Sequence, residues 1–428
     1  MATTYLTRTG ATPTTSNKYT FSCWVKRGSI GTTETIFRTY SDGSNSAQLI
    51  FDSDDTFAFQ DIVGGTTVTN LKPSNLFRDT GAWMNFIVQV DYTQATAADR
   101  AKIFINGAEV SYSATTVQSQ NGASMLNTAN NNALGSNRSN SSHYFTGSMS
   151  QVNFIDGTAY PATAFGSVNA TSGIWVANSG PTVTYGNNGF FLDMANSSDM
   201  GNDVSGNAND FTVGGGTVTQ MEDTPDNNFA TWNPLVQQSS GFVLSNGNTT
   251  ADNTNDTWRS VYSTLAPSVG KYYFECKIVN QLQTPRSIIG VCSTTQASNS
   301  SARLGYEGTN AYAYGSDGNK INNGTNTSYG NTFATGDIIS CALDLDNGKI
   351  YFGKNGTWQN SGDPTSGSTG TGSAFNVTLG ESYYFGSASY GNDGIISINS
   401  GNGYFQTTAV ASAGTNASGN GIFEYDVP

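Results

Sequence analysis

The sequence is poor in charged residues and in long apolar runs. Charged residues make up 11% of the 428 residues, and the excess of acidic over basic side chains gives a net charge of −13. Nucleic-acid binding needs clustered cations that displace counterions from phosphates, so we expect no nucleic-acid partner. No apolar run approaches the ~20 residues of a membrane span, and the first residues lack the apolar stretch of a signal peptide. We therefore expect neither membrane insertion nor a leader.

Cysteine and histidine are also scarce. The four cysteines are not arranged in CxxC pairs, so the sequence predicts buried free thiols and a chain made in a reducing compartment. The single histidine, His143, lies in a polar loop, which argues against a histidine-based catalytic triad. The sequence contains no G-x-S-x-G, P-loop or HExxH motif. We predict no catalytic residue, no metal and no cofactor.

One pair of carboxylates needs separate attention. Asp344 and Asp346 lie two residues apart on one strand face, as a glycosidase pair or a calcium loop could require. Asn347-Gly348 follows directly, and Asp before such a dipeptide favours a turn. We interpret the pair as part of a hairpin.

The abundant residues are glycine, serine, threonine and asparagine, together with 12% aromatics. Turn formers with enough apolar residues for a core are typical of all-β proteins. Period-two alternation runs through 19–26, 85–92 and 270–278, which predicts strands with one face buried and the other exposed or facing a second layer. Asn106-Gly107 and Asn347-Gly348 separate strand-like runs and predict hairpin turns.

We predict two antiparallel β-sandwich domains of the jelly-roll type, residues 1–166 and 236–428. Residues 167–235 would form an ordered, irregular connector, because their Gly, Asn, Asp and Pro residues interrupt any periodicity. The connector is too apolar to remain in water. We expect it to pack on one or both sandwiches and to fix their angle through clamp residues Phe191, Phe211, Phe229 and Trp232. Independent tumbling in solution scattering would contradict this.

The first domain carries YTFSCWVKR (19–27), IFINGAEV (103–110) and GSMSQVNFIDG (147–157) in this order. It resembles the laminin-G-like, concanavalin A-like jelly rolls. The resemblance implies two packed sheets with a rim that often binds glycans or calcium, although no calcium-ligand set matches. Trp24 either stacks on a sugar or covers the core from the rim, and we favour the second interpretation.

The second domain carries GKYYFEC (270–276), IIGVCS (288–293), AYAYGSDGNK (311–320) and GDIISCALDLDNGKIYFGKNGTW (336–358). With YYFGSASYGNDGIISIN (383–399), this series resembles a SPRY domain. The resemblance implies a bent sandwich that binds proteins through loops at one end and is not an enzyme. The binding candidates are Trp258, Arg259, Tyr312, Tyr314 and Tyr390, with ordinary packing as the favoured alternative for each.

The connector sequence LDMANSSDMGNDVSGNANDFTV (192–213), followed by DTPDNNFATWNPL (223–235), resembles linkers in structural proteins of marine tailed phages. This resemblance implies a non-enzymatic virion protein such as a fibre, appendage or decoration subunit. It would be assembled in the host cytoplasm and exposed on the virion surface after lysis. Its partners would be other virion proteins, further copies of itself and a host-surface glycan or protein. The alternatives are a secreted or cell-surface carbohydrate-binding protein and a polysaccharide depolymerase.

Overall fold

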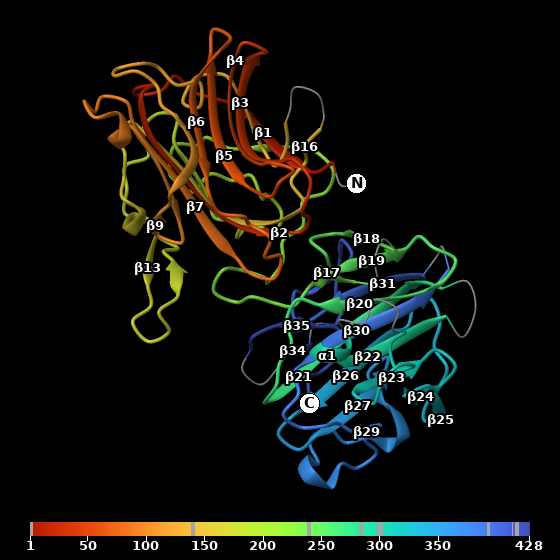
Figure 1. The fold of residues 1–428 in the computed structure, drawn as a ribbon. Helices are drawn as coiled ribbons and strands as arrows, with labels where there is room; N and C mark the ends of the chain where they lie inside the picture. Colours follow the sequence, from red (N-terminus) through yellow and green to blue (C-terminus); the bar gives the residue numbers. More distant parts are fainter. Residues whose placement is uncertain are drawn as a thin grey trace. The chain divides into compact units, whose positions relative to one another are not determined.

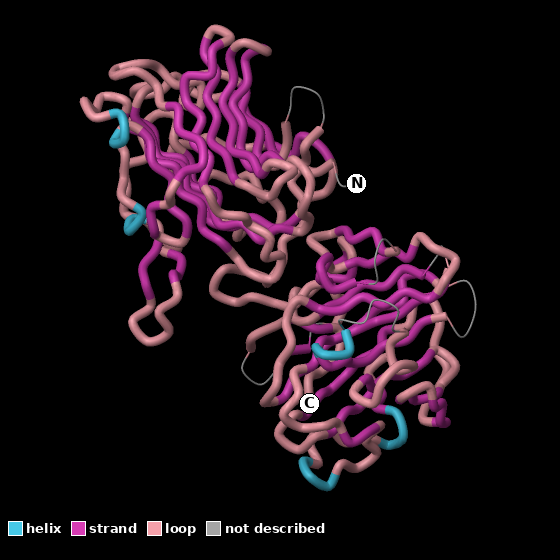
Figure 2. Tube along the Cα trace, in the orientation of Figure 1, coloured by secondary structure: helices cyan, strands magenta, loops and turns pink. Residues whose placement is uncertain are grey.

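The computed structural model describes residues 3–137, 142–237, 241–281, 286–297, 303–391, 394–412, 414–415 and 419–428. Strands make up 47% of the chain and helices 4%, and the sheets are antiparallel. Figure 2 shows how little helix is present. The predicted all-β class with two sandwiches is therefore confirmed. The chain forms two compact units, Met1–Gln220 with Thr224–Asn228, and Met221–Asp223 with Phe229–Pro428. We call them the first and the second unit.

The first unit contains two antiparallel sheets (Figure 1). The order in the eight-stranded sheet is β10 (Tyr112–Thr116), β6 (Thr66–Pro73), β5 (Phe57–Val63), β4 (Asn45–Phe51), β3 (Glu34–Asp42), β11 (Asn131–Leu134), β1 (Tyr5–Thr9) and β16 (Thr212–Gly215). The order in the six-stranded sheet is β15 (Phe190–Leu192), β12 (Gly147–Asp156), β2 (Lys18–Arg27), β7 (Met84–Asp91), β8 (Ala101–Ile105) and β9 (Ala108–Glu109). A hairpin of β13 (Gly166–Val168) and β14 (Trp175–Ala177) and two 3-10 turns, η1 (Ala97–Asp99) and η2 (Ala162–Ala164), complete the unit.

The core of the first unit lies between its two sheets. Alternation in β2 turns Phe21, Cys23 and Val25 into this core. Phe21 stacks on Phe37 of the other sheet, with ring centroids 5.2 Å apart. The predicted strand 19–26 is thus one wall of a sandwich, and period two is what places its apolar residues on one face.

The second unit also contains two antiparallel sheets. The order in the seven-stranded sheet is β17 (Trp232–Gln237), β20 (Trp258–Ser263), β30 (Tyr383–Tyr390), β22 (Ser287–Ser293), β23 (Ala311–Gly315), β24 (Asn319–Asn322) and β25 (Thr325–Ser328). The order in the eight-stranded sheet is β18 (Phe242–Ser245), β19 (Thr250–Asn253), β31 (Gly394–Asn399), β21 (Lys271–Asn280), β26 (Ile338–Asp344), β27 (Lys349–Lys354) and β28 (Thr357–Trp358), and β29 (Phe375–Asn376) also pairs with β27. The short elements are α1 (Thr294–Ala297), η3 (Gln359–Ser361), η4 (Gly367–Thr369), the hairpin of β32 (Tyr404–Phe405) and β33 (Thr408–Ala409), and the hairpin of β34 (Gly414–Thr415) and β35 (Ile422–Phe423).

The core of the second unit is likewise closed by aromatic contacts between its sheets. Phe274 of β21 stacks on Phe385 of β30 at 4.4 Å. Cys276 and Cys341 are buried beside them, and Cys23 and Cys292 are buried elsewhere. All four cysteines are free thiols, as the sequence predicts.

Much of the expected connector is built into the sandwiches. β15 pairs with β12, and β16 pairs with β1, so residues 190–192 and 212–215 are sheet strands of the first unit. Trp232 begins β17 in the second unit and is fully buried. The irregular composition of 167–235 concealed these strands because each spans only a few residues between turns.

The two predicted Asn-Gly turns have different backbone conformations in the structure. Asn106 and Gly107 have φ of 48° and 78°, as a type I′ hairpin requires. At Asn347-Gly348 only the glycine has positive φ, at 65°. The β26–β27 connection is longer than the one between β8 and β9. It is held by the Asp344 carboxylate, which accepts hydrogen bonds from the backbone N–H groups of Asp346 (3.0 Å) and Asn347 (2.9 Å).

The same use of carboxylate and amide oxygens recurs in many loops. An Asp or Asn side chain accepts the backbone N–H two residues later at Asp54, Asp91, Asn196 and Asp363, among others. Such Asx turns fix a loop locally without a core. They explain why a chain so rich in Asn and Asp forms so many short connections.

Candidate functional site

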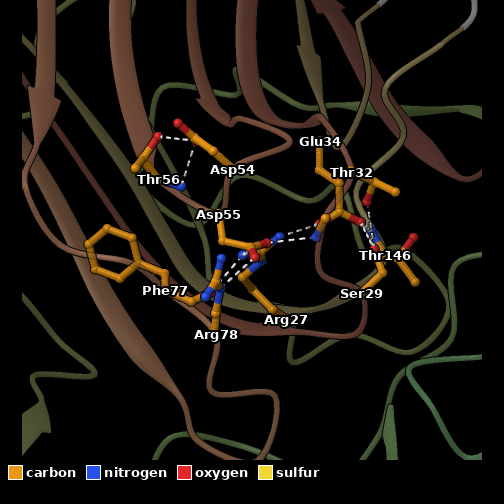
Figure 3. A network of polar contacts seen from close by, with 11 residues as sticks. Arg27, Ser29, Thr32, Glu34, Asp54, Asp55, Thr56, Phe77, Arg78 and Thr146 are labelled. Carbon is orange, nitrogen blue, oxygen red and sulfur yellow. Dashed lines mark hydrogen bonds and ion pairs between the residues drawn. The ribbon is translucent and has the colours of Figure 1, made fainter. Parts of the chain in front are cut away.

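A buried polar network of the first unit surrounds Arg27 at the end of β2. Its guanidinium lies between two carboxylates, with Nη1 3.2 Å from Asp55 Oδ1 and Nη2 3.6 Å from Glu34 Oε2 (Figure 3). It also lies over the Phe51 ring at 4.3 Å, and Arg78 Nε binds the other oxygen of Asp55 at 2.9 Å. The network joins β2, the β4–β5 turn and β3.

This network pairs two carboxylates in different environments. Burial raises the pKa of Glu34 by more than the hydrogen bond from Ser29 and the charge of Arg27 lower it. Burial also acts on Asp55, but hydrogen bonds from the Gly31 N–H and Arg78 hold the pKa of Asp55 below its ordinary value. Two neighbouring carboxyl groups whose pKa values are shifted in opposite directions are typical of a catalytic acid–base pair. Here Arg27 lies between both carboxylates and Arg78 supplies a second positive charge at Asp55. The side chains of Arg27, Glu34 and Asp55 are at least 96% buried, so we interpret the network as structural.

The second unit presents a different arrangement at one end of its seven-stranded sheet. Trp258 begins β20, its register partner Tyr390 ends β30, and Arg286 directly precedes the neighbouring strand β22. The rings of Trp258 and Tyr390 meet edge to face at 5.7 Å. Strand pairing therefore gathers side chains that are more than a hundred residues apart in the sequence.

Arginines stack on these rings. The Arg303 guanidinium lies 3.4 Å from the centroid of Trp258 and 3.6 Å from that of Tyr306, so two rings sandwich it. The Arg286 guanidinium lies 4.7 Å from the centroid of Tyr390. Trp258, Arg286, Arg303, Tyr306 and Tyr390 are all half-buried. We call these five residues the arginine–aromatic cluster.

The cluster has the physical character of an anchoring surface. Burial lowers the pKa of Arg303, but its charge is retained because arginine stays protonated far above neutral pH. Each cation–π contact stabilises the arrangement by about 0.5–2 kcal/mol. The contacts hold the guanidinium planes in fixed positions in front of the sheet. A preorganised arginine beside a Trp and Tyr rings is typical of the residues that dominate protein interfaces.

The described residues contain neither a cluster of metal-ligating side chains nor a helix that could cross a membrane. Within the described ranges, no group of three or more His, Cys, Asp or Glu side chains could hold a metal ion. Across the same part of the chain, no helix has the length and apolarity to cross a membrane. The Asp344 carboxylate accepts turn N–H groups, and Asp346 accepts the N–H of the distant Gly270 at 2.9 Å.

Comparison with known protein families assigns both units. Residues 2–163 match the concanavalin A-like lectin/glucanases superfamily, and residues 271–375 match the SPRY domain family. The chain joins a concanavalin A-like domain to a SPRY domain.

Curated relatives are similar to about a fifth of the chain. Ran-binding protein 9 of Danio rerio is 34% identical over 94 residues, which are 22% of this chain and 15% of that protein. Ran-binding protein 9 of Homo sapiens is 35% identical over 94 residues, 22% of this chain and 12% of that protein. The chain thus spans less than a fifth of the length of these relatives.

Solved structures of SPRY domains are also similar to part of the chain. The SPRY domain of human HERC1 has a TM-score of 0.31 and 20% identity, covering 39% of this chain and 96% of that structure. A human SPRY domain has a TM-score of 0.30 and 15% identity, covering 37% of this chain and 94% of that structure.

The structure separates the predicted SPRY binding residues. Trp258 and Tyr390 lie together in the arginine–aromatic cluster. Tyr312 and Tyr314 are 5% and 0% exposed and belong to the core, so they do not fit the predicted role of exposed anchors. They face inward because Ala311 and Ala313 take the alternate, outer positions of β23.

The remaining predicted site residues are also placed. Arg259 follows Trp258 on β20 but lies at Gly241, where an added Cβ would come within 2.7 Å of its Cδ. It is therefore not part of the cluster. Trp24 is 3% exposed, which does not suit a sugar-stacking platform.

The four clamp residues divide between the two domains. Phe211 belongs to the core of the concanavalin A-like domain, and Phe191 stacks on Tyr185 of the same domain. Trp232 lies in the core of the SPRY domain, and Phe229 lies against Gly401 there. That the connector fixes the angle between the domains stays a prediction.

Sequence reasoning missed Arg286, Arg303 and Tyr306. A usable signal was present, because Arg259, Arg286 and Arg303 are the three arginines that follow residue 229. Arginine is rare in this acidic chain and suits stacking on aromatic rings. The register that brings two of them to Trp258 and Tyr390 depends on strand pairing between distant segments.

Proposed function

We propose that this chain is a non-enzymatic binding protein whose SPRY domain holds a protein partner through the arginine–aromatic cluster. The sandwiching of Arg303 between Trp258 and Tyr306 supports this proposal most directly. Stacking uses the faces of the guanidinium and leaves its edges oriented for a carboxylate or a backbone carbonyl. A partner that covers the cluster would meet rigid rings and two positive charges, which are the features of interface hot spots.

The wider role that we propose is that of a structural protein exposed on the virion of a tailed phage, as a fibre, appendage or decoration subunit. The phage-like connector sequence supports it, as does the pairing of two domain types that are generally used for binding. Four buried free thiols suit folding in host cytoplasm before release by lysis. Other virion proteins, further copies of the chain and a host-surface glycan or protein are the proposed partners, and repetition on one particle would raise the overall affinity.

The cluster is tested by a Trp258→Ala variant of the full chain. Removing an anchor of this kind lowers affinity by about 30-fold, equivalent to about 2 kcal/mol. Binding is measured on purified particles assembled without the protein. Tyr272→Ala is the matched control, because Tyr272 is an aromatic residue of the same domain that is 41% exposed and lies outside the cluster. Equal binding of both variants and the unaltered chain would contradict the role of the cluster.

The virion role has a separate test. Purified particles should contain the protein at a copy number set by particle symmetry, measured by quantitative mass spectrometry. Its absence from washed particles would refute the virion role, whereas presence on particles with equal binding of the Trp258→Ala and Tyr272→Ala variants would refute only the role of the cluster.

A second candidate function, carbohydrate binding by the concanavalin A-like domain, is favoured by the name of the family that residues 2–163 match. It covers the secreted or cell-surface lectin and, if cleavage follows binding, the depolymerase. A glycan array probed with the full chain tests binding, and release of reducing sugar from host polysaccharide tests cleavage. Binding to a glycan without release of sugar would support a lectin. If the chain neither binds a glycan nor releases sugar, only the protein-binding proposal remains.

A further inference from the structure

The outer face of the eight-stranded sheet in the SPRY domain carries a small apolar surface. Tyr273, Ala342 and Tyr351 are buried there, and Trp358 packs beside them. Phe423 covers this surface, with its ring edge to face on Tyr273 at 4.9 Å. Residues 421–427, which we call the covering segment, thus lie on the side of the sheet that faces away from the main core.

A buried carboxylate holds the backbone of the covering segment. Glu275 of β21 is fully buried. Its Oε2 accepts the backbone N–H of Glu424 and its Oε1 accepts that of Tyr425, both at 2.9 Å. The hydroxyl of Tyr273 also donates to Oε1 at 2.9 Å. One side chain of the sheet therefore binds two successive main-chain N–H groups.

Further contacts to the segment use its main chain. The Asn399 side-chain amide donates to the carbonyl of Ile422 at 3.0 Å, and the N–H of Ile422 donates to the carbonyl of Gly401 at 2.9 Å. These contacts require an extended peptide with an aromatic residue at the position of Phe423. They do not require that the peptide be joined to the same chain.

The described residues of the stretch that leads into the covering segment bury little surface, although the N–H groups of Ala411 and Ser412 donate to the Glu424 carboxylate at 2.6 and 3.2 Å. Gly414 is the one buried residue among those described between 406 and 420. The secondary structure of the described part of this stretch is limited to strands of the β32–β33 and β34–β35 hairpins, each two residues long. Segments with so little buried surface open at low free energy, whereas the covering segment itself is held by Glu275 and Tyr273.

We propose that this surface is a peptide-binding site that takes the covering segment of a second copy of the chain, so that copies are linked by segment exchange. Every contact that holds the segment is made equally well by the segment of a neighbour, and such exchange is a low-cost route to oligomers. The inference goes beyond the proposed function, because it rests on these contacts alone and holds for any two copies, on a particle or in solution.

The experiment uses the full chain with a protease recognition sequence in place of residues 416–418. Cleavage after folding breaks the covalent link to residues 419–428, and extensive dialysis then removes the cut segment from the folded protein. A fluorescein-labelled peptide of residues 419–428 is then added, and uptake is followed by fluorescence anisotropy. Saturable binding is expected. A Phe423→Ala peptide should bind at least about tenfold more weakly, since it loses the buried ring. An Asp426→Asn peptide is the matched control and should bind like the native one, because Asp426 is exposed.

The uncut chain tests the identity of the occupant. Analytical ultracentrifugation over a range of concentrations should show oligomers, and excess native peptide, but not the Phe423→Ala peptide, should dissociate them. Failure of the native peptide to bind a cut chain whose circular dichroism is unchanged would refute the site. Peptide binding by the cut chain combined with a monomeric uncut chain at every concentration would refute exchange between copies.

Discussion

Asp61 makes the stability of the concanavalin A-like domain dependent on pH. This residue of β5 is fully buried, and its Oδ1 accepts the N–H of Met125 at 3.0 Å. Its Oδ2 has no hydrogen-bond partner among the described residues. The neighbouring groups are the hydroxyls of Tyr19, Tyr92 and Ser124, and no cation contributes to the environment of the carboxyl. Burial therefore raises the pKa of Asp61 from 3.8 to about 6.

The sign of the effect follows from the raised pKa. The folded state holds a proton on Asp61 more tightly than the unfolded state, so the associated stability is fully present below about pH 4 and is lost as the pH rises through about 6. Because one pKa unit corresponds to about 1.4 kcal/mol, the loss is about 3 kcal/mol. Asp61→Asn removes the charge and keeps an acceptor for Met125. The stability of the variant relative to the unaltered chain should therefore increase by about 3 kcal/mol between pH 4 and pH 8.

The measurement is scanning calorimetry of the full chain and the variant over this pH range. The transition of the SPRY domain serves as an internal control, because it should respond to pH identically in both proteins. Parallel pH profiles for the first-domain transition in the two proteins would refute the reasoning, whichever protein is more stable.

Three further outcomes are expected. Phe190→Ala removes a ring from the first core and should lower the free energy of unfolding of the concanavalin A-like domain by about 3–5 kcal/mol; a loss in the SPRY transition instead would show that 190–192 belongs elsewhere. Arg27→Met leaves Glu34 buried without its cation and Asp55 paired with Arg78 alone, and it should cost about 3–5 kcal/mol in urea unfolding. Lys72→Met, which breaks two more exposed pairs, should cost at most about 1 kcal/mol. Asp344→Ala removes the acceptor of two turn N–H groups and should cost about 1–2 kcal/mol, with faster hydrogen exchange at Asn347; unchanged exchange there would contradict the turn assignment.

The strands that could be predicted from the sequence are those in which apolar side chains recur at every second position. In β2 the core residues Phe21, Cys23 and Val25 recur at every second position, and Phe274, Cys276 and Ile278 do so in β21, so a period of two identifies each strand and its inner face. The outer face of β2 is buried as well, which the period does not reveal. β15 and β16 escaped prediction because three or four residues carry too little periodicity. β23 shows a further limit, since AYAYG alternates as an exposed tyrosine row would, yet small alanines on the outer side place both tyrosines in the core.

The candidate site could be predicted only in part. Trp258 and Tyr390 are conspicuous in the sequence as aromatic residues near strand ends. Arg303 and Tyr306 lie in a segment without strand periodicity, and only folding brings them against Trp258. The contacts that define the cluster therefore form only in the tertiary structure, and the local sequence around each residue does not indicate them.

The Asx turns have a consequence for the environments in which this fold can operate. Their hydrogen bonds join neighbouring groups over less than about 3.5 Å, and dissolved salt does not screen them as it screens surface ion pairs. At molar ionic strength, where the Debye length falls to about 3 Å, loops held by lysine–carboxylate pairs would loosen. Loops held by the Asx turns at Asn196 and Asp363 keep their shape. A surface built in this way is suited to concentrated brine as well as to dilute buffer.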